Sequence, residues 1–218
     1  MKKILLSLVV GLLALTAHDT QAQVVGFITQ PAAARGNLQI GIMASGWAVS
    51  LDTLTVSAQL KVGRSAGGTT AGDSLACDTT LINASELAGK IAVLYRGGCE
   101  FGTKALAAQR AGAVGLIIIN NAAGIINLAG GGNGLNVTIP TIMISNSDGA
   151  FLRPFIDNDS CVALIGQKRG FFSNDFGFVN GNILRPVDWA VPATQSQRPG
   201  DYVLKMGAQV VNYGQNAQ

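Results

Sequence analysis

The sequence predicts an α/β fold with one βαβ unit, followed by a loop-rich C-terminal extension. Two continuous apolar runs, KIAVLY (90–95) and VGLIIIN (114–120), have the length and composition of strands that are buried on both faces. The segment between them, 100–111, has the periodicity of a helix. A strand, a helix and a second strand in this order form a parallel pair with a right-handed crossover.

The helix of this unit is expected to bury one face only. Phe101, Ala105 and Ala108 follow one another at helical spacing, whereas Lys104 and Arg110 fall largely on the opposite side. The two basic side chains are therefore expected to face solvent.

Shorter elements flank the unit on both sides. Apolar runs bounded by Gly, Pro and polar residues predict strands and one helical turn. We expect strands in GFITQPAA (26–33), LQIGIMASGWAV (38–49), LTVSAQLKV (54–62), TIMIS (141–145) and CVALIG (161–166), and the helical turn in LINASELAGK (81–90).

Two further segments are predicted from their turn-forming residues. The glycine-rich stretch 122–136 is expected to be a flexible loop, because glycine costs the most conformational entropy to order. Ser147 and Asp148 could cap a helix that runs to about Ile156, but Pro154 is expected to damage its middle.

The N-terminus has the layout of a cleavable secretory signal peptide. Lys2 and Lys3 precede an apolar run of twelve residues, 4–15, and small residues lead to Ala22. A membrane anchor is the rival interpretation, but a bilayer span needs about 20 apolar residues. We expect a signal peptide (1–22) and a secreted or cell-surface location.

The rest of the chain divides by composition. We expect one domain over 23–167, a linker over 168–200, and over 201–218 a strand that could begin a further domain or pack back on the first one. Tyr202, Leu204 and Met206 alternate in this last segment, as in a strand.

Composition argues against most catalytic classes. The only histidine, His18, lies in the segment that export removes. Ser-His-Asp and Cys-His mechanisms need an imidazole as base, and the usual zinc sites use histidine ligands. Basic residues do not cluster, which argues against nucleic-acid binding. We therefore expect no catalytic residues, no metal and no cofactor, and no later segment is long enough to span a membrane.

Three cysteines in an exported protein indicate one disulfide and one thiol. Cys161 begins an apolar strand, where a thiol behaves as a small hydrophobic group. A nucleophilic role for it would need a base, and none is available.

The stretch GKIAVLYRGGCEFGTKALAAQRAGAVGLIIINNAAG (89–124), followed by IPTIMISNSDG (139–149), resembles the protease-associated (PA) domain. The resemblance implies a β/β/α open barrel without catalytic activity of its own. It also implies a disulfide between Cys77 and Cys99. In receptor-type members the Arg-Gly-x-Cys-x-Phe turn is implicated in gripping peptides, which here implies peptide-binding residues Arg96, Gly97, Gly98, Cys99 and Phe101.

The residues of this turn permit two interpretations. The turn precedes a helix N-terminus, where backbone N–H groups carry partial positive charge, and its glycines would let another backbone approach. Alternatively, Gly97 and Gly98 only make a tight turn, and Arg96 pairs with Glu100 or solvent.

We therefore expect a non-catalytic secreted protein that docks polypeptides. One alternative is the accessory region of a secreted peptidase, subtilisin-like or zinc-dependent, whose catalytic domain is not in this chain. The expected partner is thus a polypeptide or a peptidase domain. Another alternative is glycan binding by Phe171, Phe172 and Trp189, although packing of these aromatic residues onto the domain is the simpler expectation.

Overall fold

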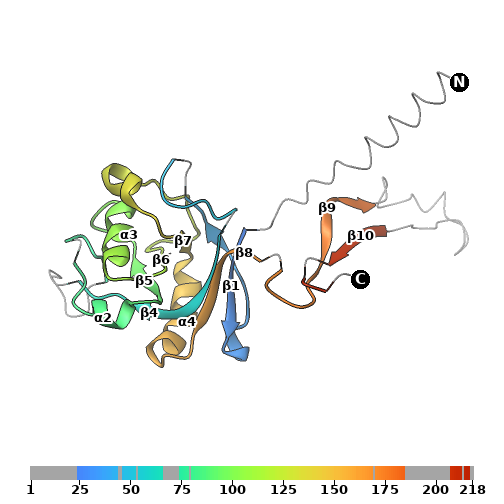
Figure 1. Cartoon of the computed structure of the whole chain (residues 1–218), viewed down its shortest axis with the longest axis horizontal. Helices are drawn as coiled ribbons and strands as arrows, with labels where there is room; N and C mark the ends of the chain where they lie inside the picture. Colours follow the sequence, from blue (N-terminus) through green and yellow to red (C-terminus); the bar gives the residue numbers. More distant parts are fainter. Residues whose placement is uncertain are drawn as a thin grey trace, which may run out of the picture.

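The computed structural model describes residues 24–43, 46–52, 54–65, 74–78, 80–168, 170–184, 207–212 and 214–216 (Figure 1). The predicted signal peptide lies outside these residues. The elements are β1 (Val24–Gln30), the 3-10 helix η1 (Ala32–Ala34), β2 (Gly36–Leu38), β3 (Ile40–Gly41), β4 (Thr55–Val62), α2 (Ala84–Leu87), β5 (Ile91–Tyr95), α3 (Phe101–Arg110), β6 (Gly115–Ile119), the 3-10 helix η2 (Gly131–Asn136), β7 (Thr141–Ile144), α4 (Asn146–Asp157), β8 (Val162–Gln167), β9 (Phe176–Leu184) and β10 (Gly207–Asn212).

Eight strands form one barrel-like sheet in the order β2-β1-β8-β4-β5-β6-β7-β3. The two strands at its ends, β2 and β3, follow each other directly in the chain. β2 pairs with β1, and β3 pairs with β7 on the other side. The segment 36–41 therefore joins the two edges of the sheet and nearly closes the barrel, which confirms the α/β open-barrel prediction.

The predicted βαβ unit is present as β5, α3 and β6. β5 and β6 are parallel, with Ile91 opposite Gly115. β4 extends this parallel arrangement on one side and β7 on the other. β1 and β8 complete the barrel with antiparallel pairing.

Alternate residues of the parallel strands pack into two separate cores. Because side chains alternate across a strand, one set faces α3 and the other lies in the barrel with α4. The first set contains Ala92, Leu94, Leu116, Ile118 and Met143, and the second contains Ile91, Val93, Ile117, Ile119, Ile142 and Ile144, packed with Leu152 and Ile156.

The helix α4 ends close to the predicted Ile156, but Pro154 does not damage its middle as expected. Its N-cap is Ser145, whose hydroxyl accepts a hydrogen bond from the Asp148 amide at 3.0 Å. Proline removes one N–H and leaves the carbonyl four residues earlier without its helical donor. That residue, Ala150, is exposed, as is Pro154, so water can satisfy the carbonyl.

The glycine-rich stretch 122–136 was predicted to be a flexible loop, but part of it packs closely against the rest of the domain. Its η2 turn packs against α3, and Gly130 and Gly134 lie against the ring of Trp47. Trp47 is buried, and its Nε1 donates a hydrogen bond to the Leu128 carbonyl at 2.8 Å. The glycines permit this close packing, since a Cβ on Gly130 would lie 2.5 Å from the indole.

The predicted linker over 168–200 contains a strand. β9 pairs in antiparallel fashion with β10, so the expected C-terminal strand has a partner, and the two form a hairpin beside the barrel (Figure 1). The alternation from Tyr202 to Met206 lies outside the described residues.

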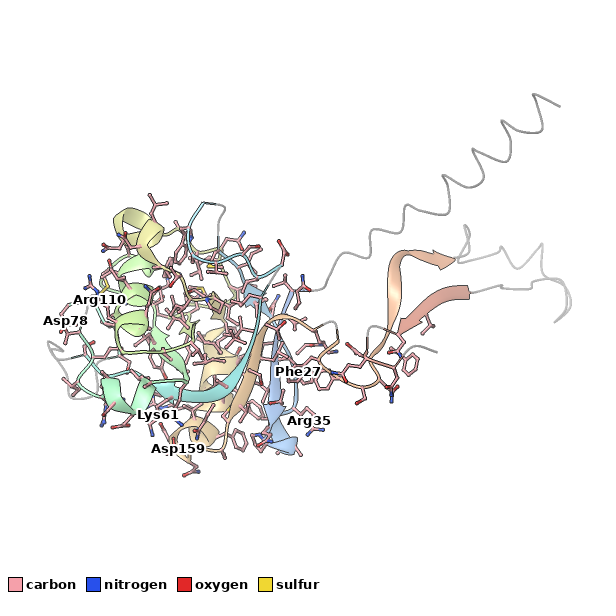
Figure 2. All side chains as sticks on the ribbon, in the orientation of Figure 1. Phe27, Arg35, Lys61, Asp78, Arg110 and Asp159 are labelled. Carbon is pink, nitrogen blue, oxygen red and sulfur yellow. A yellow bond between two sulfur atoms is a disulfide. The ribbon has the colours of Figure 1, made fainter. Side chains whose placement is uncertain are left out.

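Aromatic residues join this extension to the barrel. The rings of Phe27 on β1 and Phe172 are 5.3 Å apart in an edge-to-face arrangement, and Lys168 Nζ lies 5.3 Å from the Phe27 ring (Figure 2). Phe171 packs on Phe172 at 5.0 Å. Packing onto the domain, the simpler expectation for these aromatic residues, is thus seen for Phe172, with Phe171 packed on it. Trp189 lies outside the described residues.

Cys161 is a fully buried free thiol, and burial raises its pKa to about 11. We expect iodoacetamide at pH 8 to leave it unlabelled in the native protein and to label it in guanidinium. Because the unfolded thiol ionises first as the pH rises, the free energy of unfolding should fall between about pH 9 and 11. In Cys161→Ala this part of the fall, measured by urea denaturation, should be missing; identical pH profiles would contradict the assignment.

Candidate functional site

Polar residues gather where the parallel strands end. β4, β5, β6 and β7 run in the same direction, so their carboxyl ends meet at one edge of the sheet. The residues that follow these ends include Arg64, Arg96, Asn120 and Ser145. In open α/β sheets, this edge is where ligands usually bind.

The turn over residues 96–101, called the 96–101 turn below, leaves the end of β5 and leads into α3. The Arg96 amide donates to the Ile119 carbonyl, and its Nη1 donates to Asn120 Oδ1, both at 2.9 Å. Gly97 and Gly98 have φ values of +134° and +76°, a region that favours glycine. A Cβ on Gly98 would lie only 2.8 Å from Cys77 Sγ.

A disulfide anchors the 96–101 turn. Cys77 and Cys99, the pair implied by the resemblance, are bonded with their Cα atoms 5.5 Å apart. The bridge ties the segment 74–78 to the turn, and its sequence separation is 22 residues. On the chain-entropy model, a loop of this length contributes about 3 kcal/mol.

Glu100 is engaged with the glycine-rich loop. It is the N-cap residue of α3, and its Oε2 accepts a hydrogen bond from the Gly132 amide at 2.9 Å. Arg96 is bonded to Asn120 instead. The structure thus does not show the Arg96–Glu100 pairing that the residues alone permitted.

Lys104 is completely buried, contrary to the expectation that it faces solvent. Its Nζ donates a hydrogen bond to the Leu75 carbonyl and lies 3.8 Å from Cys77 Sγ. The helix α3 is covered on its second side by η2 and by the segment 74–78, so its polar side is also enclosed. No local pattern signals this, because it depends on where two distant loops pack.

The five residues implied as peptide-binding lie together in the 96–101 turn. Gly98 is exposed, whereas Arg96, Gly97 and Cys99 are half-buried. Phe101 is also half-buried and packs against the core beneath α3. Gly98 and Glu100 are therefore the exposed residues of the turn, Arg96 is partly accessible beside them, and Phe101 supports the turn from the core.

Other kinds of site have no counterpart in the part of the chain that the structure describes. Across those residues, no three His, Cys, Asp or Glu side chains are grouped so that they could hold a metal ion. None of the described helices has the length and apolar character needed to cross a bilayer.

Comparison with known proteins identifies the central segment. A family model for the PA domain matches residues 56–152, from β4 into α4. Signal peptide peptidase-like 5 of Arabidopsis thaliana is 37% identical over 83 residues, which are 37% of this chain and 16% of that protein. The minor extracellular protease Vpr of Bacillus subtilis (strain 168) is 41% identical over 64 residues, 29% of this chain and 7% of that protein.

A solved structure gives the same fold. The aminopeptidase from Aneurinibacillus sp. strain AM-1 matches with a TM-score of 0.50 at 20% identity, over 66% of this chain and 30% of that chain. The chain thus spans only a small part of each of these relatives. Residues 56–152, which include the 96–101 turn and the parallel strands of the barrel, thus match the PA domain family.

Proposed function

We propose that this chain is a non-catalytic, exported PA-domain protein that docks polypeptides at the 96–101 turn. The supporting observation is that the turn presents an arginine beside a glycine backbone on a rigid base. The disulfide holds the turn from one side, and Lys104 holds the segment 74–78 against α3 from below. A rigid site loses little conformational entropy when it binds.

Arg96 supplies the polar part of the docking surface. A guanidinium carries five N–H donors, and among the described residues the Arg96 guanidinium is hydrogen-bonded to Asn120. The remaining donors suit a carboxylate or a peptide carbonyl of another chain. With Glu100 bonded to Gly132, its carboxylate is engaged away from Arg96.

The thiols support binding without cleavage. Cys77 and Cys99 are joined in a disulfide, and Cys161 is buried with its pKa raised to about 11. Export would also remove His18, the only histidine. A bound polypeptide would therefore meet neither a thiolate nor an imidazole base.

We expect Arg96→Ala in the mature chain to weaken binding of peptide-library ligands about tenfold or more. A hydrogen bond to a charged group contributes about 1.5–3 kcal/mol, and 1.4 kcal/mol corresponds to a factor of ten. Fluorescence polarisation with the selected peptides would measure it.

Arg110→Ala is the matched control, because it removes the same charge from the exposed far end of α3 (Figure 2). Its affinity should equal that of the unmodified chain. Equal affinities for all three proteins would place the docking surface elsewhere.

A second proposal is that the chain is the accessory region of a peptidase. It is supported by the names of the relatives, which include a protease and an aminopeptidase, and by the small share of each that the chain covers. A peptidase signature in frame beyond Gln218 in the coding DNA would favour this proposal over the first.

A further inference from the structure

A charged pocket lies beside the 96–101 turn, at the same edge of the sheet. Its cavity has a volume of about 190 Å³. It is lined by Lys61 on β4, Arg64 in the segment after β4 and Glu86 on α2. Arg153 and Asp157 line it from α4. The pocket is thus formed at the carboxyl end of β4, where the sheet changes from parallel to antiparallel pairing.

Both walls of the charged pocket carry both signs of charge. On one wall, Glu86 lies 3.0 Å from Arg64 Nη2 and 3.5 Å from Lys61 Nζ. On the other, Arg153 Nε lies 2.8 Å from Asp157. The Arg64, Glu86, Arg153 and Asp157 side chains are between 40% and 53% exposed. Such half-exposed ion pairs contribute little to stability, because solvent screens them, so a ligand can replace or bridge them at small cost.

The arginines are better placed than the lysine to receive a ligand. Lys61 is also bonded to Asp159 at 2.8 Å, and this hydrogen bond raises the pKa of Lys61 (Figure 2). A second hydrogen bond helps to fix the Arg153 side chain, because its Nη1 donates to Tyr95 Oη at 3.0 Å. Arg64 and Arg153 thus present planar donors to the pocket from two different parts of the fold.

The size and the charges define the ligand. The cavity corresponds to roughly six water molecules at about 30 Å³ each, below the range of about 300–1,000 Å³ that drug-sized ligands occupy. Val62 and Ile156 supply apolar lining. We propose that the charged pocket binds a small free amino acid, whose carboxylate meets Arg64 and Arg153 and whose ammonium meets Glu86 and Asp157.

This proposal is independent of polypeptide docking at the 96–101 turn, and it is tested with small probes. The mature chain is titrated with alanine, sodium acetate, methylammonium chloride and N-acetylalanine amide, and backbone amide shifts are followed by NMR. Alanine should shift the amides of Arg64, Glu86 and Asp157 with a Kd of about 1 mM, a free energy near −4 kcal/mol. The three probes that lack one or both charges should bind at least tenfold more weakly.

Variants separate the charged pocket from general surface binding. Arg153→Met and Glu86→Gln should each weaken alanine binding at least tenfold, whereas Arg110→Met on exposed α3 should leave it unchanged. If Arg153→Met alters the native spectrum, Arg64→Met in the segment after β4 takes its place. The proposal is overturned if acetate binds as well as alanine, or if alanine leaves the three amides unmoved while the protein is folded.

Discussion

Replacing Gly102 with alanine should lower the melting temperature by about 6–12 °C. Gly102 lies in the first turn of α3, where the helix meets the backbone of the glycine-rich loop. An added Cβ would lie 2.0 Å from the Gly130 carbonyl oxygen and 2.7 Å from the Gly134 amide nitrogen. Both obstacles are backbone atoms that no change of rotamer can move, so we expect a loss of about 3 kcal/mol.

Gly132→Ala is the matched control in the same loop. Its Cβ would meet Glu100 Oε2 at 3.9 Å, an ordinary contact, and Gly132 is not among the residues with positive φ. Its free energy of unfolding should stay within about 0.5 kcal/mol of that of the unmodified protein, which is about 1–2 °C in melting temperature. Differential scanning calorimetry of the two variants checks both results. Equal melting temperatures would mean that the loop is not packed on α3 in solution.

Removing the disulfide should have an effect of similar size. The double variant Cys77→Ser, Cys99→Ser should lose about 3 kcal/mol, because the unfolded chain gains the freedom that the bridge removes. Polypeptide docking should also weaken, since Gly98 lies against Cys77 Sγ and the bridge positions the 96–101 turn.

Urea denaturation with and without dithiothreitol measures this loss. The reductant should bring the midpoint of the unmodified chain to that of the double variant and should leave the double variant unchanged. An unmoved midpoint, with both thiols shown free by mass spectrometry, would rule out a stabilising role for the bridge.

The βαβ unit could be predicted because its signals are local. KIAVLY and VGLIIIN are continuous apolar runs, and both became strands of the buried parallel sheet. The resemblance of the Arg-Gly-Gly-Cys-x-Phe turn then implied the disulfide partner of Cys99, which spacing alone left open among three cysteines.

The features that were predicted wrongly depend on contacts between distant segments. Lys104 faces the polar side of a helix wheel, but the segment 74–78 and η2 cover that side. Glycines that indicated flexibility instead permit close packing, because Trp47 lies against Gly130 and Gly134. Helical or strand periodicity describes one element at a time and cannot show which loop will cover it.

The charged pocket also could not be predicted from the sequence. Its walls come from Arg64, Glu86 and Arg153, which are far apart in the chain and belong to three different parts of the fold. Arg153 and Asp157 at a spacing of four on a helix indicate an ordinary surface ion pair. Only the fold brings this pair into one pocket with Glu86.

The closure of the barrel by the segment 36–41 bears on the order in which the chain acquires its structure. Val24 is paired with Gln167, and Ile40 with Ile144. These strands can therefore pair only after residues more than a hundred positions later in the chain have been synthesised. Pairings of this kind give a high contact order and slow folding. A newly made chain would thus remain open while it emerges, which suits the export that is proposed above.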